Sequence, residues 1–519
     1  MDASISPRDL GLDSDEWWPN QLEALLKCAA AFGSGKKFVL CEAPPGVGKT
    51  HLAVGLSRLM QYETVFLTST KDLQEQYEKV SGSPRVIGRP NFPCKIAPVV
   101  SASFGQCVSG EKCQYAGLDG AKGCGYFDQL RKGLESPEAA LNYAFYFRGV
   151  NYAGYFADRD LVVCDEAHLL RKELESFVSV SLSYAVLKRF GLMPSNCQDW
   201  SVERWIKWAA DSLPNVATLI RQTRARARES GDREGDKLIA DPRTLASLTT
   251  LSRSLYTLLK GKQGWVPISM QNGIEFKPVW VAPYTEQALL RHADRFLFLS
   301  ATIGNPATFC EVLGLNPKEA FVLKCPSVFD PSRRPIHYRS VGRVSGQNEL
   351  VYNKLVEEVD RILEKHQDQK GLLHTVSYKL TQAIQQRSKF KARLLVPTAG
   401  GRAAAIEKFR KTRLPLVMVS PSMTTGIDLP YDGLRFQIIC KLPFSDLGDP
   451  IVKEQSKTPL GKNLGLQDMI NTMEQAYGRI MRASDDAGVT YLLDGNWDWV
   501  RHAAKDYISP WFTEAIVGE

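Results

Sequence analysis

The sequence predicts an α/β protein built from two lobes, each with a mainly parallel β-sheet. Short runs of Val, Ile, Leu and Phe recur through both ends of the 519-residue chain. Runs of this length and composition are typical of strands buried on both faces of a parallel sheet. Segments with helical spacing of apolar residues alternate with these runs, as they do in layered α/β folds. We therefore expect one lobe over about residues 1–330 and a second over 331–519.

The expected strands are named by their apolar runs. In the first lobe they are 38–41, 64–67, 161–164 and 296–299, and in the second 371–374, 393–396, 416–419, 436–439 and 491–493. Two stretches break the alternation. Residues 90–135 are rich in Gly, Pro and Cys and predict a loop-built insertion, whereas residues 172–290 carry mostly helical patterns. Within the second stretch, an Asn-Gly step between two extended pieces at 264–280 predicts a β-hairpin.

The composition limits the classes of protein that the chain could represent. Hydrophobic residues make up 44% and charged residues 24%, which is typical of a globular protein of about three or four domains at this length. No run approaches the roughly 18 apolar residues of a membrane helix, and the polar N-terminus is no secretory signal, so we expect a cytoplasmic protein without a membrane partner. The net charge of +8 permits a nucleic-acid partner without requiring one.

The clearest local motif is the segment APPGVGKT at residues 43–50, which follows an expected strand and precedes a helical pattern. This strand–loop–helix order is the context that a P-loop requires. Gly46 and Gly48 would let backbone N–H groups approach phosphate oxygens, and the helix N-terminus would favour the anion. Lys49 would reach the β- and γ-phosphates of ATP, and the Thr50 hydroxyl would bind Mg²⁺.

Carboxylates follow a second expected strand, because the run at 161–164 leads into Asp165-Glu166-Ala167-His168. Asp165 could hold Mg²⁺ through water, and Glu166 could polarise the attacking water. Upstream of the P-loop, the amide of Gln21 could read the adenine edge with a donor and an acceptor together. From the residues alone, a structural role for that upstream segment is an equally good interpretation.

The second lobe contributes a basic motif near its end. Gln475 opens the segment QAYGRIMR, in which Arg479 and Arg482 stand three residues apart, a spacing that would place both on one helix face. Their guanidinium groups could stabilise charge on the transferring phosphoryl group. Gly426 and Asp428 follow an expected strand, in a loop that could sense the nucleotide. Taken in isolation, such an arginine pair is more often a partner in surface salt bridges.

Four of the eleven cysteines fall in one short segment. They are Cys94, Cys107, Cys113 and Cys124. An intracellular chain seldom keeps structural disulfides, so the cluster predicts a metal or iron–sulfur centre. Four thiolates suit a [4Fe–4S] cluster, and they also suit tetrahedral zinc, although zinc sites usually show shorter Cys spacings. The spacing alone leaves both ligands open, together with the plain alternative of four unlinked core cysteines.

The order of these motifs resembles that of the XPD/DinG-like superfamily 2 iron–sulfur DNA helicases. The matching segments are Gln21, 43–50, 68–76 (TSTKDLQEQ), 165–168 (DEAH), 300–302 (SAT), 372–380 (LLHTVSYKL), 424–430 (TTGIDLP), 441–444 (KLPF) and 475–482 (QAYGRIMR). The four cysteines lie between the third and fourth of these segments, where this subgroup carries its cluster. The close cysteine pair often seen in the group is absent here. The context nevertheless favours iron–sulfur over zinc.

The resemblance implies a motor that uses ATP and Mg²⁺ to move 5′ to 3′ on single-stranded DNA and to open forked or 5′-overhang duplex DNA. It implies two RecA-like lobes, with an iron–sulfur insert and a mostly helical arch both inserted in the first lobe. The expected limits are 1–89, 136–171 and 286–330 for lobe 1, 90–135 for the iron–sulfur insert, 172–285 for the arch and 331–519 for lobe 2. The cluster would stiffen a wedge that splits the duplex.

The same resemblance suggests how the two lobes cooperate. ATP would bind between them, with Lys49, Thr50 and Asp165 on one side and the two arginines on the other. His168 and the segment 300–302 would connect the nucleotide to the strand. Contacts with the backbone of the strand are expected from three threonines at loop ends after strands. These are Thr68, Thr70 and Thr375.

Other functions fit parts of the same pattern. One alternative is an ATP-driven single-strand translocase or an RNA helicase that does not unwind DNA. Another is a non-catalytic nucleic-acid-binding scaffold that uses the cysteine cluster for structure. A monomer would suffice for each, and protein partners from a repair, phage or CRISPR-linked pathway are compatible with the sequence.

Overall fold

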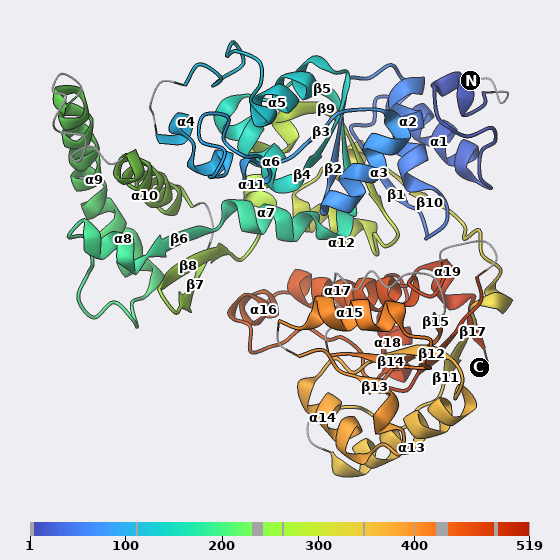
Figure 1. Ribbon diagram of the computed structural model, residues 1–519. Helices are drawn as coiled ribbons and strands as arrows, with labels where there is room; N and C mark the ends of the chain where they lie inside the picture. Colours follow the sequence, from blue (N-terminus) through green and yellow to red (C-terminus); the bar gives the residue numbers. More distant parts are fainter. Residues whose placement is uncertain are drawn as a thin grey trace.

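The computed structural model describes residues 5–109, 113–230, 242–261, 264–345, 348–398, 400–421, 434–481 and 486–517. Over these ranges the strands form two seven-stranded sheets and one three-stranded sheet. Figure 1 shows the two large sheets in separate bodies, here named lobe 1 and lobe 2, and the small sheet at the base of a helical arm that projects from lobe 1. No helix in these ranges combines the length and the apolarity that crossing a membrane requires.

The sheet of lobe 1 has the order β10-β1-β9-β5-β2-β4-β3, and every neighbouring pair is parallel. Its strands are β1 (Phe38–Glu42), β2 (Thr64–Thr68), β3 (Arg85–Val86), β4 (Glu138–Asn142), β5 (Arg159–Asp165), β9 (Ala293–Ser300) and β10 (Ala320–Lys324). The four runs predicted for this lobe are confirmed as β1, β2, β5 and β9. The sheet adds β3, β4 and β10, which the sequence did not predict.

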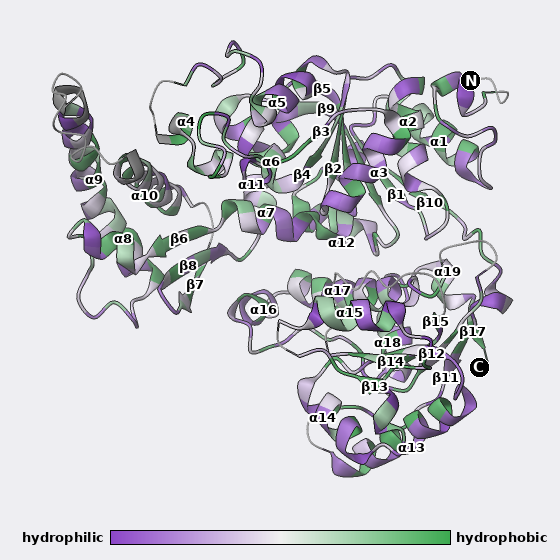
Figure 2. Cartoon of the chain, viewed as in Figure 1, coloured by the Kyte–Doolittle hydropathy of each residue, from purple (hydrophilic) through white to green (hydrophobic). Residues whose placement is uncertain are grey.

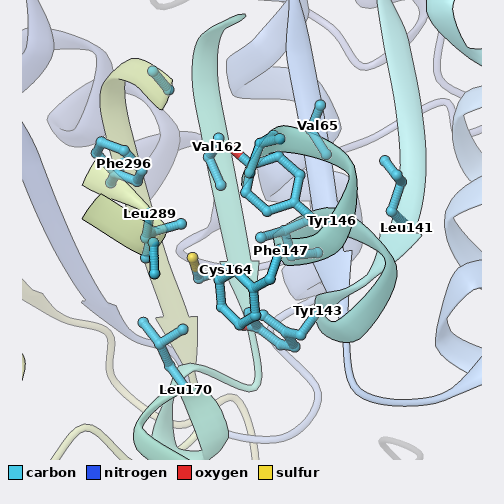
Figure 3. Close-up of a cluster of buried hydrophobic side chains, with 14 of the residues drawn as sticks. Val65, Leu141, Tyr143, Tyr146, Phe147, Val162, Cys164, Leu170, Leu289 and Phe296 are labelled. Carbon is cyan, nitrogen blue, oxygen red and sulfur yellow. The ribbon is translucent and has the colours of Figure 1, made fainter. Parts of the chain in front are cut away.

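Helices cover both faces of this sheet, as expected for strands that are hydrophobic on both sides. They are α1 (Gln21–Gly33), α2 (Lys49–Leu59), α3 (Lys71–Ser81), α5 (Gly125–Glu135), α6 (Tyr143–Arg148), α7 (Leu170–Val178), α11 (Ala282–Ala288) and α12 (Pro306–Leu313). Alternate residues of β1 enter opposite cores, Phe38 and Leu40 on one face and Val39 and Cys41 on the other. Figure 3 shows the first core, where aromatic side chains of α6 pack on β5.

The segment between β3 and α5 is built mostly from loops, as predicted, but the predicted range 90–135 extends too far, because residues 125–135 form helix α5, which packs in the core of lobe 1. Its regular elements are two short 3₁₀ turns, Arg89–Asn91 and Ala102–Phe104, and the helix α4 (Gln106–Ser109). An isolated antiparallel bridge joins Pro93 to Ser101. Such loop-built structure depends on side-chain contacts at a few points, because ladder hydrogen bonds hold very little of it together.

The arm of lobe 1 combines helices with the three-stranded sheet. Its elements are β6 (Val180–Ser183), α8 (Tyr184–Arg189), α9 (Val202–Ser230), α10 (Pro242–Lys260), β7 (Trp265–Met270) and β8 (Gly273–Pro278). The predicted hairpin at 264–280 is confirmed, because β7 and β8 are antiparallel and meet at Met270 and Gly273. Strand β6 pairs antiparallel with β8 on its other side. A hydrophobic core of its own, centred on the fully buried Trp205, holds the arm together.

Lobe 2 repeats the parallel α/β pattern, with the sheet order β13-β14-β12-β15-β16-β11-β17. The strands are β11 (Ile336–Tyr338), β12 (Lys370–His374), β13 (Leu394–Leu395), β14 (Val417–Ser420), β15 (Leu434–Ile439), β16 (Val489–Leu492) and β17 (Ile516–Val517). The helices are α13 (Glu349–Lys365), α14 (Tyr378–Arg387), α15 (Arg402–Lys411), α16 (Pro450–Gln455), α17 (Pro459–Tyr477), α18 (Trp497–Ala503) and α19 (Pro510–Thr513). All five predicted runs are confirmed as strands of this sheet, and Figure 2 shows how hydrophobic those strands are.

Candidate active site

Three sequence motifs meet at one edge of the sheet of lobe 1. Strands β1, β9 and β5 are neighbours in that order, and all run in the same direction. Their C-terminal ends therefore open on the same side, where open parallel sheets bind their ligands. The loop after β1 carries the P-loop pattern, β5 ends at Asp165, and Ser300 ends β9. The fold thus brings together segments that lie more than a hundred residues apart in the sequence.

The P-loop curls tightly around the first turn of α2. Gly46 (φ +87°) and Gly48 (φ +76°) both adopt the left-handed region, where a Cβ atom is costly. A Cβ at Gly46 would overlap the Phe329 ring, and one at Gly48 would lie 2.5 Å from Gln21 Nε2. Gly48 is the N-cap of α2, so the free N–H groups of that helix face the loop. This cradle of backbone donors fits a phosphate anion.

Lys49 and Thr50 complete the first turn of α2. Lys49 Nζ lies 3.4 Å from Ala43 O, to which it donates, and Thr50 is buried at the same helix end. An ammonium group, a hydroxyl group and the buried Asp165 carboxylate are the donor set that ATP and Mg²⁺ require. The residues present therefore fit both groups.

Gln21 lies directly behind the P-loop. Its Nε2 donates to Val47 O (3.2 Å) and Gly48 O (2.9 Å), and its Oε1 accepts from Trp18 N (3.1 Å). The side chain is buried, and both amide hydrogens are used by the loop. Gln21 thus braces the P-loop in this structure, while its role toward adenine stays a prediction.

Asp165 is buried at the end of β5 and is held at several points. Its Oδ1 accepts from Glu166 N (2.9 Å), its Oδ2 accepts from Tyr77 Oη (3.2 Å), and its carbonyl accepts from Tyr143 Oη (2.8 Å). Burial, followed by the neighbouring Glu166 carboxylate, raises the pKa of Asp165 to about 7, and Lys49 opposes that rise. The site therefore favours a nearby cation that would keep this carboxylate ionised.

Glu166 and His168 continue from this strand end in an unusual backbone conformation. Glu166 has φ +51°, a left-handed value that non-glycine residues adopt at a cost, which is typical of functional sites. Burial lowers the pKa of His168 to about 3, so the imidazole is neutral at ordinary pH. His168 Nδ1 lies 2.9 Å from Ser300 Oγ and 3.3 Å from a Glu166 carboxylate oxygen. Because the ring is neutral, the second contact is no ion pair.

Helix α17 carries lobe 2 against this edge, and Figure 1 shows it on the side of lobe 2 that faces lobe 1. Gln475 Nε2 donates to Thr302 Oγ1 (3.1 Å), and Gln467 Oε1 accepts from Asn305 N (3.1 Å). A Cβ at Gly478 would lie 2.9 Å from Pro45 of the P-loop. The start of the basic motif in lobe 2 thus touches both the segment 300–302 and the P-loop of lobe 1.

The arginine motif differs in one respect from the prediction that both arginines lie on a helix face. Helix α17 ends at Tyr477, and Arg479 follows the C-cap residue Gly478. Beyond the helix the backbone continues in tighter i to i+3 turns, with Arg479 N bonded to Ala476 O and Ile480 N to Tyr477 O. Of the predicted nucleotide-site residues, Gly426, Asp428 and Arg482 lie outside the described residues.

The predicted strand contacts of two threonines are wrong for this arrangement. Thr68 and Thr375 are fully buried, so neither presents a side chain to a nucleic acid. Their hydroxyl groups bond within their own lobes, to Thr70 O (3.1 Å) and to Thr381 Oγ1 (2.7 Å). Thr70, in contrast, is the exposed N-cap of α3, where its hydroxyl accepts from Leu73 N.

The four clustered cysteines line one cavity of the loop-built segment. Its lining residues are Arg89, Cys94, Lys95, Ile96, Ala102, Cys107, Cys113, Tyr115, Cys124 and Phe127. Arg89 Nη1 donates to Cys107 Sγ (3.0 Å), and a Cβ at Gly105 would lie 3.1 Å from Cys94 Sγ. Soft sulfur donors beside cationic side chains fit an anionic thiolate-bound centre. Among the described residues, no three His, Cys, Asp or Glu side chains are placed to hold a single metal ion.

Some contacts at this site were not predicted from the sequence. Tyr77 and Tyr143 both hold Asp165, and Phe329 packs on Gly46. The sequence does place Tyr77 three residues after the buried Gln74, a spacing that indicates the inner face of α3. That spacing could have predicted that the Tyr77 hydroxyl is buried. It could not have predicted the partner, Asp165, because that residue lies on a strand distant in the sequence.

Comparison with known proteins agrees with the motif order. Residues 359–514 match a family described as helicase C-terminal domain. The ATP-dependent DNA helicase YoaA of Haemophilus influenzae is 25% identical over 236 residues, 43% of this chain and 36% of that protein. The 3′-5′ exonuclease DinG of Bacillus subtilis is 22% identical over 259 residues, 44% of this chain and 27% of that protein. The matched regions thus span about a third of these curated relatives.

The fold extends the likeness over nearly the whole chain. A solved XPD helicase covers 95% of this chain and 98% of its own, with a TM-score of 0.64 and 15% identity. The Xpd4 structure from S. tokodaii covers 96% and 100%, with a TM-score of 0.58 and 16% identity. These findings confirm the predicted resemblance to XPD/DinG-like helicases, and the chain has the fold of the solved XPD helicases.

Proposed function

We propose that this chain is an ATP-dependent DNA helicase that moves 5′ to 3′ along single-stranded DNA and unwinds duplex DNA ahead of it. The observation that carries the proposal is the meeting of two lobes at one phosphate cradle. Lys49 and Asp165 come from lobe 1, and Gln475 reaches Thr302 from lobe 2. A nucleotide held at such a junction contacts both lobes, so its hydrolysis changes how they pack.

The chemistry follows from the side chains at the junction. Thr50 and Asp165 would hold Mg²⁺, which supplies positive charge to the phosphates when it is bound. Lys49 binds the terminal phosphates, and Glu166 polarises the attacking water. Arg479 follows Gly478, which packs against Pro45 of the P-loop. We assign Arg479 to the stabilisation of charge that develops during phosphoryl transfer. Arg482 belongs to the same assignment through its place in the motif.

The same two lobes and the insertions of lobe 1 are assigned to contact with the nucleic acid. Ser300 and Thr302 lie between the His168 imidazole and Gln475, so a shift of lobe 2 reaches the end of β5 through hydrogen bonds. The arm, which lies within the predicted arch at 172–285, and the predicted insert at 90–135 would guide single-stranded DNA. Cys94, Cys107, Cys113 and Cys124 would hold a [4Fe–4S] cluster whose role is to stiffen the insert.

The first experiment measures ATP hydrolysis with and without single-stranded DNA. We expect hydrolysis that DNA stimulates in the wild type and a rate at least a hundredfold lower in Lys49→Ala, since a lost phosphate contact of this kind costs about 3 kcal/mol or more. Lys79→Ala is the matched control, because Lys79 is exposed and pairs with Glu75 on the surface of α3. A Lys49→Ala protein that hydrolyses ATP at the wild-type rate would refute the assignment.

The second experiment separates the helicase from its alternatives. Duplexes with a 5′ or a 3′ overhang, in DNA and in RNA, are offered to the wild type with ATP. We expect unwinding of the 5′-overhang DNA alone. Hydrolysis without unwinding would indicate a translocase, and unwinding of the RNA duplex alone would indicate an RNA helicase.

The cluster assignment has its own test. Protein purified without oxygen should be brown and contain about four irons per chain, and Cys113→Ser should lose iron while Cys197→Ser, in the core of the arm, retains it. Zinc at about one ion per chain would instead support the tetrahedral alternative.

A further inference from the structure

Tyr77, on helix α3, places its hydroxyl group beside Asp165, the carboxylate of the proposed nucleotide site. The residue is fully buried on α3, and its Oη donates to Asp165 Oδ2 at 3.2 Å. Its ring stacks on Phe66 of β2, with ring centroids 4.7 Å apart and an interplanar angle of 21°. Because the ring is clamped against β2, the position of the hydroxyl is fixed by packing rather than by its hydrogen bond.

Asp165 has few other constraints on its carboxylate. Tyr143 holds the carbonyl of the residue, and the Glu166 N–H binds Oδ1. Oδ2 has Tyr77 as its hydrogen-bond donor among the described residues. Without that donor, the carboxylate would be held at one oxygen and could rotate about its Cβ–Cγ bond, which has a broad, soft torsional profile.

The Tyr77 hydroxyl is the donor in this contact, because an ionised carboxylate offers only acceptor oxygens.

We propose that Tyr77 is a positioning residue of the nucleotide site, whose hydroxyl holds Asp165 Oδ2 in the orientation that binding of a Mg²⁺–nucleotide requires. The inference rests on the proposed nucleotide site but not on unwinding or on the direction of travel. It also gives α3, whose N-cap is the exposed Thr70, a direct connection to the Asp165 carboxylate.

The test compares Tyr77→Phe with Tyr146→Phe. Tyr146 is a buried tyrosine on α6, shown in Figure 3, and its Oη has no hydrogen-bond partner among the described residues. Binding of a fluorescent ADP analogue is titrated in Mg²⁺ and in excess EDTA. We expect Tyr77→Phe to lower affinity about threefold to tenfold in Mg²⁺ and to leave it unchanged in EDTA, since one hydrogen bond is lost. Tyr146→Phe should match the wild type in both conditions.

Hydrolysis supplies a second measurement. Tyr77→Phe should need a higher Mg²⁺ concentration for half-maximal rate and should recover the wild-type maximum at saturating Mg²⁺. A double-mutant cycle with Asp165→Asn should show no further loss from Tyr77→Phe, because the partner is already changed. Wild-type affinity of Tyr77→Phe in Mg²⁺, or an equal loss in EDTA, overturns the positioning role. A wild type that binds no nucleotide overturns the proposed function instead.

If Tyr77→Phe lowers the thermal midpoint more than Tyr146→Phe does, the double-mutant cycle with Asp165→Asn still distinguishes a positioning role from a loss of stability. The Mg²⁺-dependent part of the loss is then compared between the single variant and the double variant at a temperature where both are folded. A Mg²⁺-dependent loss that persists in the Asp165→Asn background also overturns the proposal.

Discussion

Replacing Arg334 with methionine should strongly destabilise lobe 2. Arg334 is 1% exposed, although it carries a charge, and it lies just before β11 in the segment that joins the lobes. Its guanidinium group donates to Phe329 O (3.2 Å), Tyr477 Oη (2.9 Å), Trp511 O and Glu514. The single side chain thus ties the connecting segment to the end of α17 and to the C-terminal residues.

The size of the effect follows from what the substitution leaves behind. Methionine fills much of the same volume, so little cavity energy is lost. Two buried carbonyl groups and the Tyr477 hydroxyl would lose a donor, at about 1–3 kcal/mol for each group that stays unsatisfied. Removing the buried guanidinium also removes its own desolvation cost, which offsets part of the loss. We expect a net loss of about 3–5 kcal/mol, the range seen when one partner of a buried charged network is removed.

The assay is urea unfolding followed by circular dichroism, with Arg361→Met as the matched control. Arg361 also pairs with a glutamate of lobe 2, Glu358, but its side chain is 68% exposed. A pair of that kind contributes about 0–1 kcal/mol. The reasoning is refuted if Arg334→Met unfolds at the same urea concentration as Arg361→Met.

Two further substitutions test the packing of the P-loop and the burial of a histidine. Gly46→Ala should lower the affinity for a fluorescent ADP analogue at least tenfold, because its Cβ would overlap Phe329. Gly35→Ala, with a similar positive φ but open space around it, should not change that affinity. Burial lowers the pKa of His374 to about 3, so its contribution to stability is present above pH 6.5 and is lost as the pH falls. Between pH 6.5 and 5 the free energy of unfolding of the wild type should fall by about 2 kcal/mol, a loss that His374→Asn should not show. Urea unfolding measures this difference, with His502→Asn, at an exposed position, as the control. Equal acid sensitivity of all three proteins would contradict the expectation.

The strands that were predicted are those whose sequences alone indicate burial on two faces. Runs such as 161–164 and 416–419 consist of Val, Leu, Met and Cys, and they became β5 and β14. Strand β4 was missed, because its sequence EAALN contains residues that favour helices. Pairing with β2 and β3 makes this segment a strand, and these partners are distant in the sequence, so the residues around β4 do not reveal them.

The candidate site was predictable where a motif fixes its own backbone. Gly46, Gly48 and Lys49 act through the local strand–loop–helix turn, so their place follows from neighbouring residues. The contacts of Tyr77 with Asp165 and of Gln475 with Thr302 depend on which elements pack together in space. The end of α17 at Tyr477, beyond which the chain continues in tighter turns, was not predicted either.

The arm leaves and rejoins lobe 1 through neighbouring antiparallel strands, since Val180 of β6 stands opposite Phe276 of β8. The first and last strands of the arm therefore lie side by side, as do the termini of an inserted domain. Such a stem can be cut and bridged by a short linker without breaking the parallel sheet beneath it. Helix α7 (Leu170–Val178) connects Asp165, at the end of β5, to β6, the first strand of the arm. The arm is therefore connected through one helix to the carboxylate that the phosphate cradle faces.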